Sequence, residues 1–285
     1  MANAAGRRVA SATEFQALVR PLLAADEARH TVMLGVIDQL VRNPGRYAES
    51  YLWAVEHGGV AAAAALRTPP YHAVVAQPRS PEALEALAQA VLRDSPDLPG
   101  CNGARPEADD FAAAWVRLAG GRAIERMRLR LHRLETLEDV REGPGAMRAA
   151  TPADRDLLIG WMQAFAEETG VQGGADELAR GVDANIRLPL GMVVWEDGGR
   201  VVSLAGSRST SPGVARVGPV YTPPDVRARG YATRLTWELT RALLERGEHT
   251  IVLFTDQANP TSNSIYRRIG YLPVCEAVEL DFEQE

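Results

Sequence analysis

At the centre of the chain's second half stands the stretch Arg227-Ala228-Arg229-Gly230-Tyr231-Ala232-Thr233, between a predicted strand that ends near Tyr221 and a helical pattern that runs to Gly247. A glycine at such a junction lets the backbone approach a ligand, and the first N–H groups of a helix have no partners inside it. With the helix dipole they form a site for an anion such as pyrophosphate, to which Arg227 and Arg229 would add charged donors. The same residue types also open ordinary surface helices, so the rest of the chain has to decide between these interpretations.

Composition limits the classes of protein that this chain can represent. Its 285 residues are enough for two domains, and 46% hydrophobic with 24% charged residues is typical of a globular protein. The net charge of −6 argues against a nucleic-acid partner. All 31 basic residues are arginine, which excludes a Walker-type phosphate loop and a lysine Schiff base, since both require lysine.

The two cysteines, Cys101 and Cys275, lie far apart and lack the spacing of a metal site or a redox pair. We therefore expect no metal, no disulfide and a reducing, cytoplasmic environment. No apolar segment follows Arg7 and Arg8, as a signal peptide would require, and the longest apolar run, residues 60–66, is too short to span a membrane.

In both halves the predicted elements include the run helix, helix, hairpin, strand, helix, which indicates an internal repeat; a chance match of the two Gly-Gly hairpins is the alternative. In the first half, helices are predicted within residues 14–41 and at 81–92 and 106–118, and strands at 51–55, 60–66, 71–76 and 124–134. In the second half, helices are predicted at residues 152–168, 176–188, 231–247 and 260–269, and strands near 147 and at 192–195, 201–204, 214–221 and 250–255. A charged connection, residues 135–144, separates them, and we predict domains at residues 1–140 and 145–285.

The halves differ at the turn itself. The first half has Gln77-Pro78-Arg79-Ser80-Pro81 where the second half has its glycine turn. Proline removes N–H donors that a phosphate would need. We therefore expect only the second half to bind the ligand.

Two features flank the glycine turn. Gly218-Pro219 should interrupt the pairing of its strand and free backbone groups for a ligand, although an ordinary edge-strand proline has the same sequence. Further on, Asn259 is the predicted N-cap of a short helix that carries Tyr266. A phenol with a pKa of about 10 can give its proton to a departing thiolate with a pKa of roughly 8.5. By itself, Tyr266 also fits an amphipathic core tyrosine.

Together, Arg227-x-x-Gly230-x-Ala232 and Asn259-x-x-Ser262-x-x-x-Tyr266 resemble two motifs of the GNAT superfamily of acyl-CoA-dependent N-acyltransferases, in the family's order. The family usually has alanine at the position of Ser262. The resemblance covers residues 145–282, whereas residues 1–134 resemble the same fold without its loop, as in tandem members with one degenerate half. It implies an α/β fold of two tandem GNAT-like domains, each with a mixed, mostly antiparallel central sheet flanked by helices.

The resemblance also implies a reaction. An amine attacks acetyl-CoA directly in a ternary complex, and Tyr266 protonates the leaving thiolate. The residues that it assigns to the pantetheine arm and the pyrophosphate of acetyl-CoA are Val220, Tyr221, Thr222, Arg227, Ala228, Arg229, Gly230, Tyr231, Ala232, Thr233, Asn259, Asn263 and Tyr266.

A base for the attacking ammonium is not evident. Some members of the family carry a glutamate on the strand before the loop, but residues 214–221 contain no carboxylate. Glu168, Asp183 and Glu196 are candidates by position, and a water relay is an equal alternative. None of the five histidines has a spacing typical of catalysis or metal binding, and we expect His30 to be structural and the others to lie at turns or surface positions.

The sequence thus predicts an acetyl-CoA-dependent N-acetyltransferase for a primary amine of a small molecule or peptide. We expect a monomer or homodimer with no nucleic-acid or membrane partner. The alternative is a CoA-binding sensor or scaffold that is catalytically weak, which the missing strand glutamate and the degenerate first half would favour.

Overall fold

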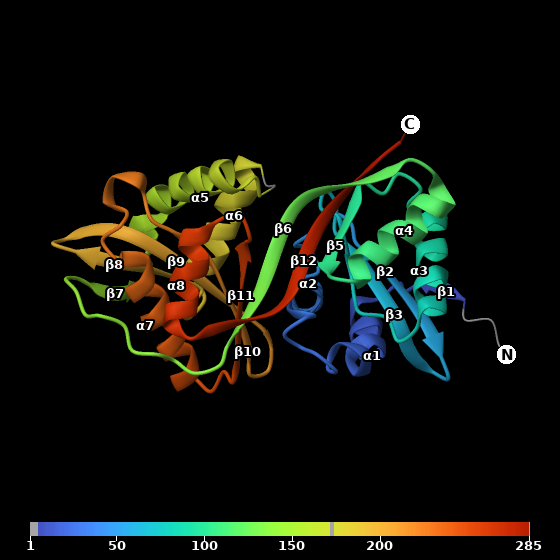
Figure 1. Ribbon diagram of the computed structural model, residues 1–285, viewed down its shortest axis with the longest axis horizontal. Helices are drawn as coiled ribbons and strands as arrows, with labels where there is room; N and C mark the ends of the chain where they lie inside the picture. Colours follow the sequence, from blue (N-terminus) through green and yellow to red (C-terminus); the bar gives the residue numbers. More distant parts are fainter. Residues whose placement is uncertain (1–4, 172–173, 285) are drawn as a thin grey trace. The chain divides into compact units, whose positions relative to one another are not determined.

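The computed structural model describes residues 5–171 and 174–284, which form two compact units (Figure 1). Unit 1 consists of the described residues of Met1–Leu131, Thr255–Ala258 and Pro273–Glu285, and unit 2 of those of His132–Phe254 and Asn259–Leu272. Among the described residues, no helix is long and apolar enough to cross a membrane.

The elements of the first half are β1 (Gly6–Arg8), α1 (Ala12–Leu23), α2 (Thr31–Arg42), β2 (Tyr51–His57), β3 (Val60–Arg67), β4 (Ala73–Val75), α3 (Pro81–Asp94), β5 (Gly100–Ala104), α4 (Glu107–Ala119) and β6 (Arg122–Leu134). Those of the second half are β7 (Ala146–Ala149), α5 (Arg155–Thr169), α6 (Ala175–Ile186), β8 (Met192–Asp197), β9 (Arg200–Ser211), β10 (Val214–Tyr221), α7 (Tyr231–Glu245), β11 (Thr250–Asp256), α8 (Pro260–Ile269) and β12 (Tyr271–Glu283). Two short 3-10 turns, Pro152–Asp154 and Pro224–Val226, precede α5 and α7.

The order of elements confirms the predicted internal repeat. Each half runs strand, two helices, three strands, helix, strand, helix, strand. Each half also contains one parallel pair joined by a crossover helix, β4 with β5 and β10 with β11, whereas the other described pairs are antiparallel. The mixed, mostly antiparallel α/β fold predicted from the sequence is therefore confirmed.

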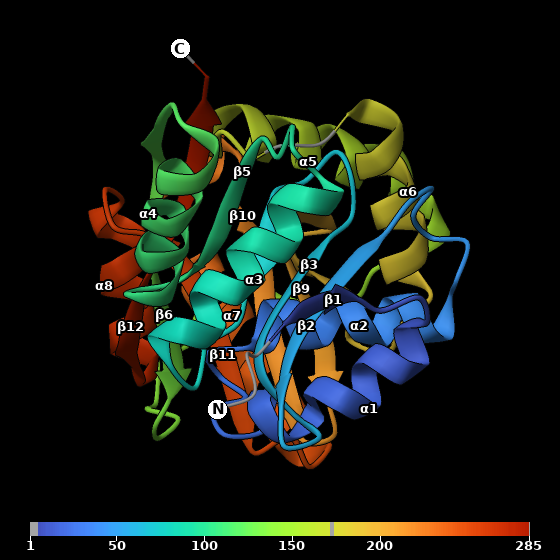
Figure 2. The same cartoon turned by 90° about the vertical axis from the view of Figure 1, so that its right-hand side faces the viewer.

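The sheet of unit 1 is covered by helices on both faces (Figure 2). Residues that alternate along β2 point to opposite sides: Trp53 and Val55 pack against α3 and α4, and Leu52 and Ala54 pack against α1 and α2. This period of two is that of a strand with both faces buried.

Unit 2 has the same layered arrangement. On β8, Val193 and Trp195 belong to the core formed with α7 and α8, whereas Met192 and Val194 belong to the core formed with α5 and α6. The strand order β11-β10-β9-β8-β7 puts β10 next to β11, so the crossover helix α7 starts at the edge where β10 ends.

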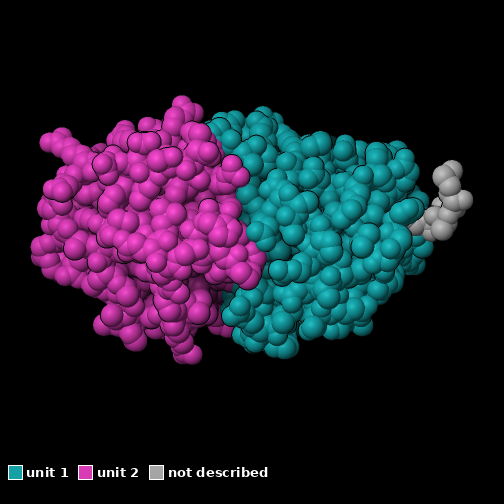
Figure 3. Space-filling model, turned by 90° about the horizontal axis from the view of Figure 1, so that it is seen from below, with its two compact units in different colours: residues 1–131, 255–258, 273–285 teal, residues 132–254, 259–272 magenta. Residues whose placement is uncertain are grey.

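The compact units differ from the predicted domains at the C-terminus (Figure 3). The predicted domains are continuous in sequence, but the described residues of 255–258 and 273–285 fall in unit 1, and residues 132–140 fall in unit 2. The physical reason is hydrogen bonding, because Ala277–Asp281 of β12 pairs antiparallel with Gly100–Ala104 of β5. The sequence did not predict β1, β5 or β12.

Candidate active site

Strand β10 is interrupted where Gly218 and Pro219 predicted it. Its antiparallel register with β9 shifts between Val217, which pairs with Ser207, and Val220, which pairs with Ala205. The parallel ladder with β11 runs only from Val214–Thr250 to Val217–Leu253. Beyond Val217, strand β10 therefore continues without a described partner on its β11 side, which leaves backbone groups available there.

Gly206 of β9 lies opposite the interruption. A Cβ at this position would come within 3.1 Å of the Gly218 carbonyl oxygen and 3.2 Å of Pro219 Cδ. These distances are shorter than ordinary van der Waals contact, and the neighbours are backbone and a rigid ring. The glycine thus allows the bulge to pack closely on β9.

Replacing Gly206 with alanine is expected to destabilise the protein by about 1–3 kcal/mol, because overpacking shifts the backbone of the bulge. The free energy of unfolding in denaturant measures this effect. The control is Gly160→Ala on α5, where a Cβ would meet nothing within 4 Å, so that helix propensity should make this change neutral or stabilising. Equal effects of the two substitutions would contradict the close packing at Gly206.

The turn before α7 has the predicted shape of an anion site. Gly230 is the N-cap residue with φ +78°, no side chain caps the first turn, and no acidic residue lies in it among the described residues. Ala228 also has a positive φ, +63°. Left-handed residues alternating with others turn successive N–H groups to one side, as in other anion-binding backbone turns. The backbone N–H groups of the turn can therefore hydrogen-bond to a pyrophosphate without help from a side chain.

The two arginines of the turn have different surroundings. Both Glu168 carboxylate oxygens accept from Arg227 Nη2 at 2.8 Å, and the Thr222 carbonyl accepts from its Nε at 2.7 Å. Its guanidinium thus ties the end of β10 to α5, rather than being free at the rim of the turn. Arg229 is exposed and lies beside the Tyr231 hydroxyl.

The end of β10 that is predicted to contact the pantetheine arm, residues 220–222, is held in place by contacts with β9 and α5. Ser203 Oγ donates to the Tyr221 carbonyl at 3.0 Å and lies 2.8 Å from Thr222 Oγ1. The Tyr221 ring packs against Trp161 of α5, with ring centroids 6.1 Å apart. Val220 is half-buried. Backbone and side-chain contacts therefore fix these three residues in front of the turn.

Helix α8 begins as predicted. Asn259 Oδ1 accepts from the Ser262 N–H at 3.1 Å, and Pro260 follows as the first helical residue. Asn263 donates from Nδ2 to the Asn259 carbonyl at 2.8 Å. Both amides therefore stabilise the first turn of α8.

Tyr266 lies on the buried side of α8 and is 8% exposed. Its ring meets Tyr271 edge to face, with centroids 6.2 Å apart. The Tyr271 hydroxyl pairs with Thr240 Oγ1 at 2.8 Å, whereas the Tyr266 hydroxyl forms no hydrogen bond within the described residues. Burial raises the pKa of Tyr266 to about 12, so this phenol keeps its proton and has it available for a ligand.

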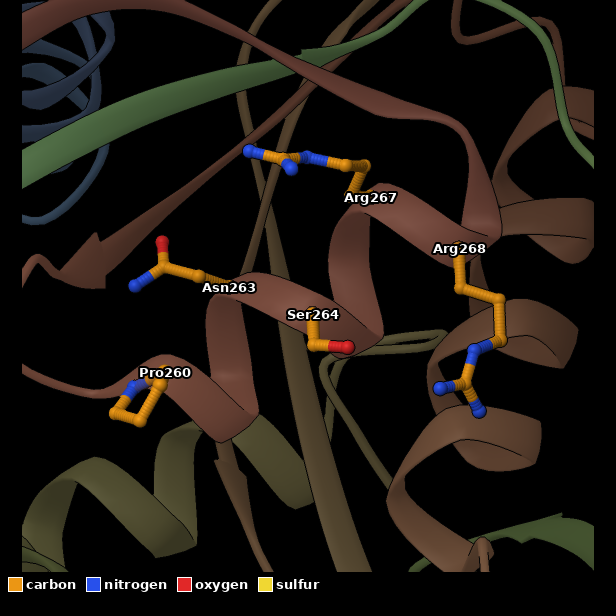
Figure 4. A pocket seen from close by; sticks show the side chains of 5 residues that line it. All are labelled: Pro260, Asn263, Ser264, Arg267 and Arg268. Atoms are coloured by element: carbon orange, nitrogen blue, oxygen red, sulfur yellow. The ribbon is translucent and has the colours of Figure 1, made fainter.

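The outer side of α8 carries an open depression of about 450 Å³, lined by Pro260, Asn263, Ser264, Arg267 and Arg268 (Figure 4). Arg267 and Arg268 extend to different sides of the helix. Neither arginine forms an ion pair with a carboxylate of residues 5–171 or 174–284. The surface beside Asn263 is thus open to an anionic group.

Each of the three candidate bases is bound to a different arginine. Arg148 donates to Glu196 at 2.7 Å, Arg155 to Asp183 at 2.6 and 3.0 Å, and Arg227 to Glu168 at 2.8 Å. The hydrogen bond from Arg155 lowers the pKa of Asp183. An arginine-bound carboxylate is a weak proton acceptor.

The expected surface positions of the histidines are wrong for His72 and His132, each of which is only 4% exposed. His72 lies between Glu279 and Asp281 of β12, at 3.0 and 3.2 Å, a position that depends on the unpredicted last strand. His30 is structural as expected: its Nδ1 lies 3.1 Å from the Leu23 carbonyl and its Nε2 accepts from the Gln77 N–H. No cluster of described residues could hold a metal ion.

In the first half, the equivalent turn before α3 does not offer an anion site. Ser80 Oγ accepts from the Ala83 N–H at 3.2 Å, Pro81 is the first residue of α3, and Glu82 lies in its first turn. At the start of α3, Ser80 binds an N–H group and Glu82 adds negative charge, whereas no side chain caps the first turn of α7. This difference supports the expectation that only the second half binds an anion.

Solved structures with the same fold cover nearly the whole chain. The GNAT-family acetyltransferase from Colwellia psychrerythraea has a TM-score of 0.65 at 12% identity, covering 98% of this chain and 99% of that one. The GCN5-related N-acetyltransferase from Sphaerobacter thermophilus has 0.63 at 16%, covering 99% and 96%. A tandem GNAT protein from the clavulanic acid biosynthesis pathway has 0.59 at 14%, covering 98% and 99%.

These likenesses define the class of fold: the chain is a protein of tandem GNAT fold. More particularly, residues 193–278 match the family model described as FR47-like protein. That segment contains the strand interruption, the glycine turn and Tyr266. No curated protein sequence matches the chain.

Proposed function

We propose that this protein is an acetyl-CoA-dependent N-acetyltransferase for a primary amine of a small molecule or peptide, with its catalytic site in unit 2. The observation that carries the proposal is the course of β10, which runs without a β11 partner after Val217 and leads to the uncapped N-terminus of α7. Free strand groups suit the amides of a pantetheine arm, and free helix N–H groups suit a pyrophosphate. The free cysteines Cys101 and Cys275 support a reducing, cytoplasmic location.

In the proposed reaction the amine nitrogen attacks the thioester carbonyl carbon, a C–N bond forms, and the C–S bond breaks. A backbone N–H of β10 beside the bulge stabilises the oxyanion of the tetrahedral intermediate. Tyr266 donates its hydroxyl proton to the departing sulfur, the nitrogen of the intermediate releases its extra proton to solvent, and Tyr266 recovers a proton from solvent. Because burial raises its pKa, Tyr266 keeps this proton until the thiolate departs.

The ammonium form of the acceptor has to lose a proton before it attacks. Glu168, Asp183 and Glu196 are each bound by arginine, and β10 offers no carboxylate. We therefore propose that water carries this proton to solvent. An acceptor with a lowered amine pKa would then react fastest, because more of it is unprotonated at neutral pH.

Calorimetric titration with acetyl-CoA, followed by a panel of primary amines with detection of free CoA, tests the proposal. Micromolar binding and release of CoA with at least one amine are the expected results. Binding without turnover or slow hydrolysis would favour a CoA-binding sensor, which the arginine-bound carboxylates make the second candidate. No binding would contradict both functions.

The pH profile of kcat/KM should lack a falling limb from Tyr266 below about pH 11, because its pKa lies at about 12 and the acid stays protonated below that value. Rates measured between about pH 6 and 10.5 should rise as the amine loses its proton and then stay level. A falling limb at about pH 10 that disappears in Tyr266→Phe would contradict the raised pKa.

A further inference from the structure

Arg234, in the first turns of α7, has surroundings unlike those of most arginines in this chain. Its guanidinium carbon lies 5.6 Å from the centre of the Trp195 ring and 5.3 Å from that of the Tyr231 ring. Its Nη2 donates to the Arg229 carbonyl at 2.9 Å. A Cβ on Gly143 would come within 2.5 Å of its Nη1, so the connection between the halves also packs closely on it.

The aromatic side chains around Arg234 are themselves anchored. Trp195 Nε1 donates to the Pro144 carbonyl at 3.0 Å, and the Tyr231 hydroxyl donates to Asp197 Oδ2 at 2.5 Å. Trp195 is 4% and Tyr231 6% exposed. A planar guanidinium between fixed rings has little rotational freedom, and a cation within about 6 Å of a ring is attracted to its face.

The hydrogen bond to Arg229 sets the direction of one N–H group. The Arg229–Gly230 peptide is trans, and in a trans peptide the C=O and the following N–H point in opposite directions. Because the Arg229 carbonyl points toward Arg234, the Gly230 N–H points away from that side chain. This N–H comes directly before the free N–H groups of α7.

Arg234 also contributes a positive charge at the start of α7. Among the described residues it forms no ion pair with a carboxylate, and the first turn of α7 contains no acidic residue. A cation at a helix N-terminus is unfavourable unless an anion is near. A bound pyrophosphate would remove this cost.

We propose that Arg234 is a positioning residue for the donor's pyrophosphate: it orients the Arg229–Gly230 peptide and adds positive charge behind the turn. This inference rests on the proposed function. It predicts that the effect of Arg234 depends on the pyrophosphate of the ligand and not on the thioester arm.

The test compares acetyl-CoA with S-acetylpantetheine, which has the same arm but no pyrophosphate. Arg234→Met removes the charge and the hydrogen bond and should raise the Kd of acetyl-CoA roughly 10- to 100-fold. The Kd of S-acetylpantetheine, measured by displacement, should change less than about twofold. The salt dependence of acetyl-CoA binding should also weaken, because one charge is lost.

Arg241→Met is the matched control. Arg241 lies on the same helix with its guanidinium 5.6 Å from the Trp237 ring, but it is paired with Glu238 and Glu245. This variant should bind both ligands like the unmodified protein. Arg234→Lys keeps the charge without the planar fork and should show a smaller loss with the same selectivity; it decides the question if Arg234→Met does not fold.

Unchanged acetyl-CoA binding in Arg234→Met, or equal losses for the two ligands, would overturn the positioning role. An equal loss in Arg241→Met would do the same. Failure of the unmodified protein to bind acetyl-CoA would instead contradict the proposed function, and this inference with it.

Discussion

Tyr266→Phe is expected to lower turnover about 10²- to 10⁴-fold while the Kd of acetyl-CoA changes less than about twofold. The substitution removes only the hydroxyl, and that hydroxyl has no hydrogen-bond partner among the described residues. The fold should therefore lose little, and the reaction should lose the acid that protonates the thiolate. Steady-state rates with a reactive amine and calorimetric titration measure the two quantities.

Tyr271→Phe is the matched control for this substitution. The two tyrosines form one edge-to-face pair, but the Tyr271 hydroxyl is bonded to Thr240. Its loss should destabilise the protein by about 1 kcal/mol and leave turnover nearly unchanged. If Tyr266→Phe keeps full turnover, or if both variants lose turnover equally, Tyr266 is not the catalytic acid.

Gly230→Glu should raise the Kd of acetyl-CoA at least 100-fold, by roughly 3 kcal/mol or more. Gly230 has φ +78°, and a Cβ there would lie 2.9 Å from Arg234 Nη1. The substitution thus strains the turn, displaces Arg234, and puts a negative charge where the pyrophosphate binds. Titration with acetyl-CoA measures the loss.

Two controls separate charge from strain. Gly230→Ala adds the strain without the charge and should have an intermediate effect on acetyl-CoA binding. Gly247→Glu adds a carboxylate just beyond the other end of α7, at φ +91° with no atom within 4 Å of a Cβ, and should reduce stability but not binding. Equal losses from Gly230→Glu and Gly247→Glu would mean that the turn is not the anion site.

Short-range sequence patterns were enough to predict most helices and strands of the second half. Asn259 and Pro260 predicted the start of α8, and Gly218-Pro219 predicted the interruption of β10; both predictions are confirmed. A cap or a bulge depends on residues a few positions apart. The assignment of individual residues to acetyl-CoA stays a prediction.

Strand β5 shows why other elements could not be predicted. Its sequence, Gly100-Cys101-Asn102-Gly103-Ala104, has neither the alternation nor the β-branched residues typical of a strand. It is a strand because β4 and β12 supply hydrogen bonds on its two sides. Those partners lie far away in sequence, so no local pattern signals them.

The partners of the charged side chains could not be predicted from the sequence either. Nothing in the sequence indicates that Arg227 binds Glu168, or that Arg234 lies between Trp195 and Tyr231. With 31 arginines and 37 acidic residues, the possible pairs are too many for spacing to choose among them. Only the packing of α5, β8 and α7 brings these groups within reach.

The sequence by itself determined the repeated run of two helices, a hairpin, a strand and a helix, the glycine turn, and the helix that carries Tyr266, because these features follow from backbone propensities and short spacings. The tertiary structure alone decided that β12 pairs with β5, that the candidate bases are bound by arginines, and that the Tyr266 side chain is buried while its hydroxyl has no hydrogen-bond partner among the described residues. Each of these depends on groups that are distant in sequence, and their interaction energies arise only once the sheet and its covering helices are in contact.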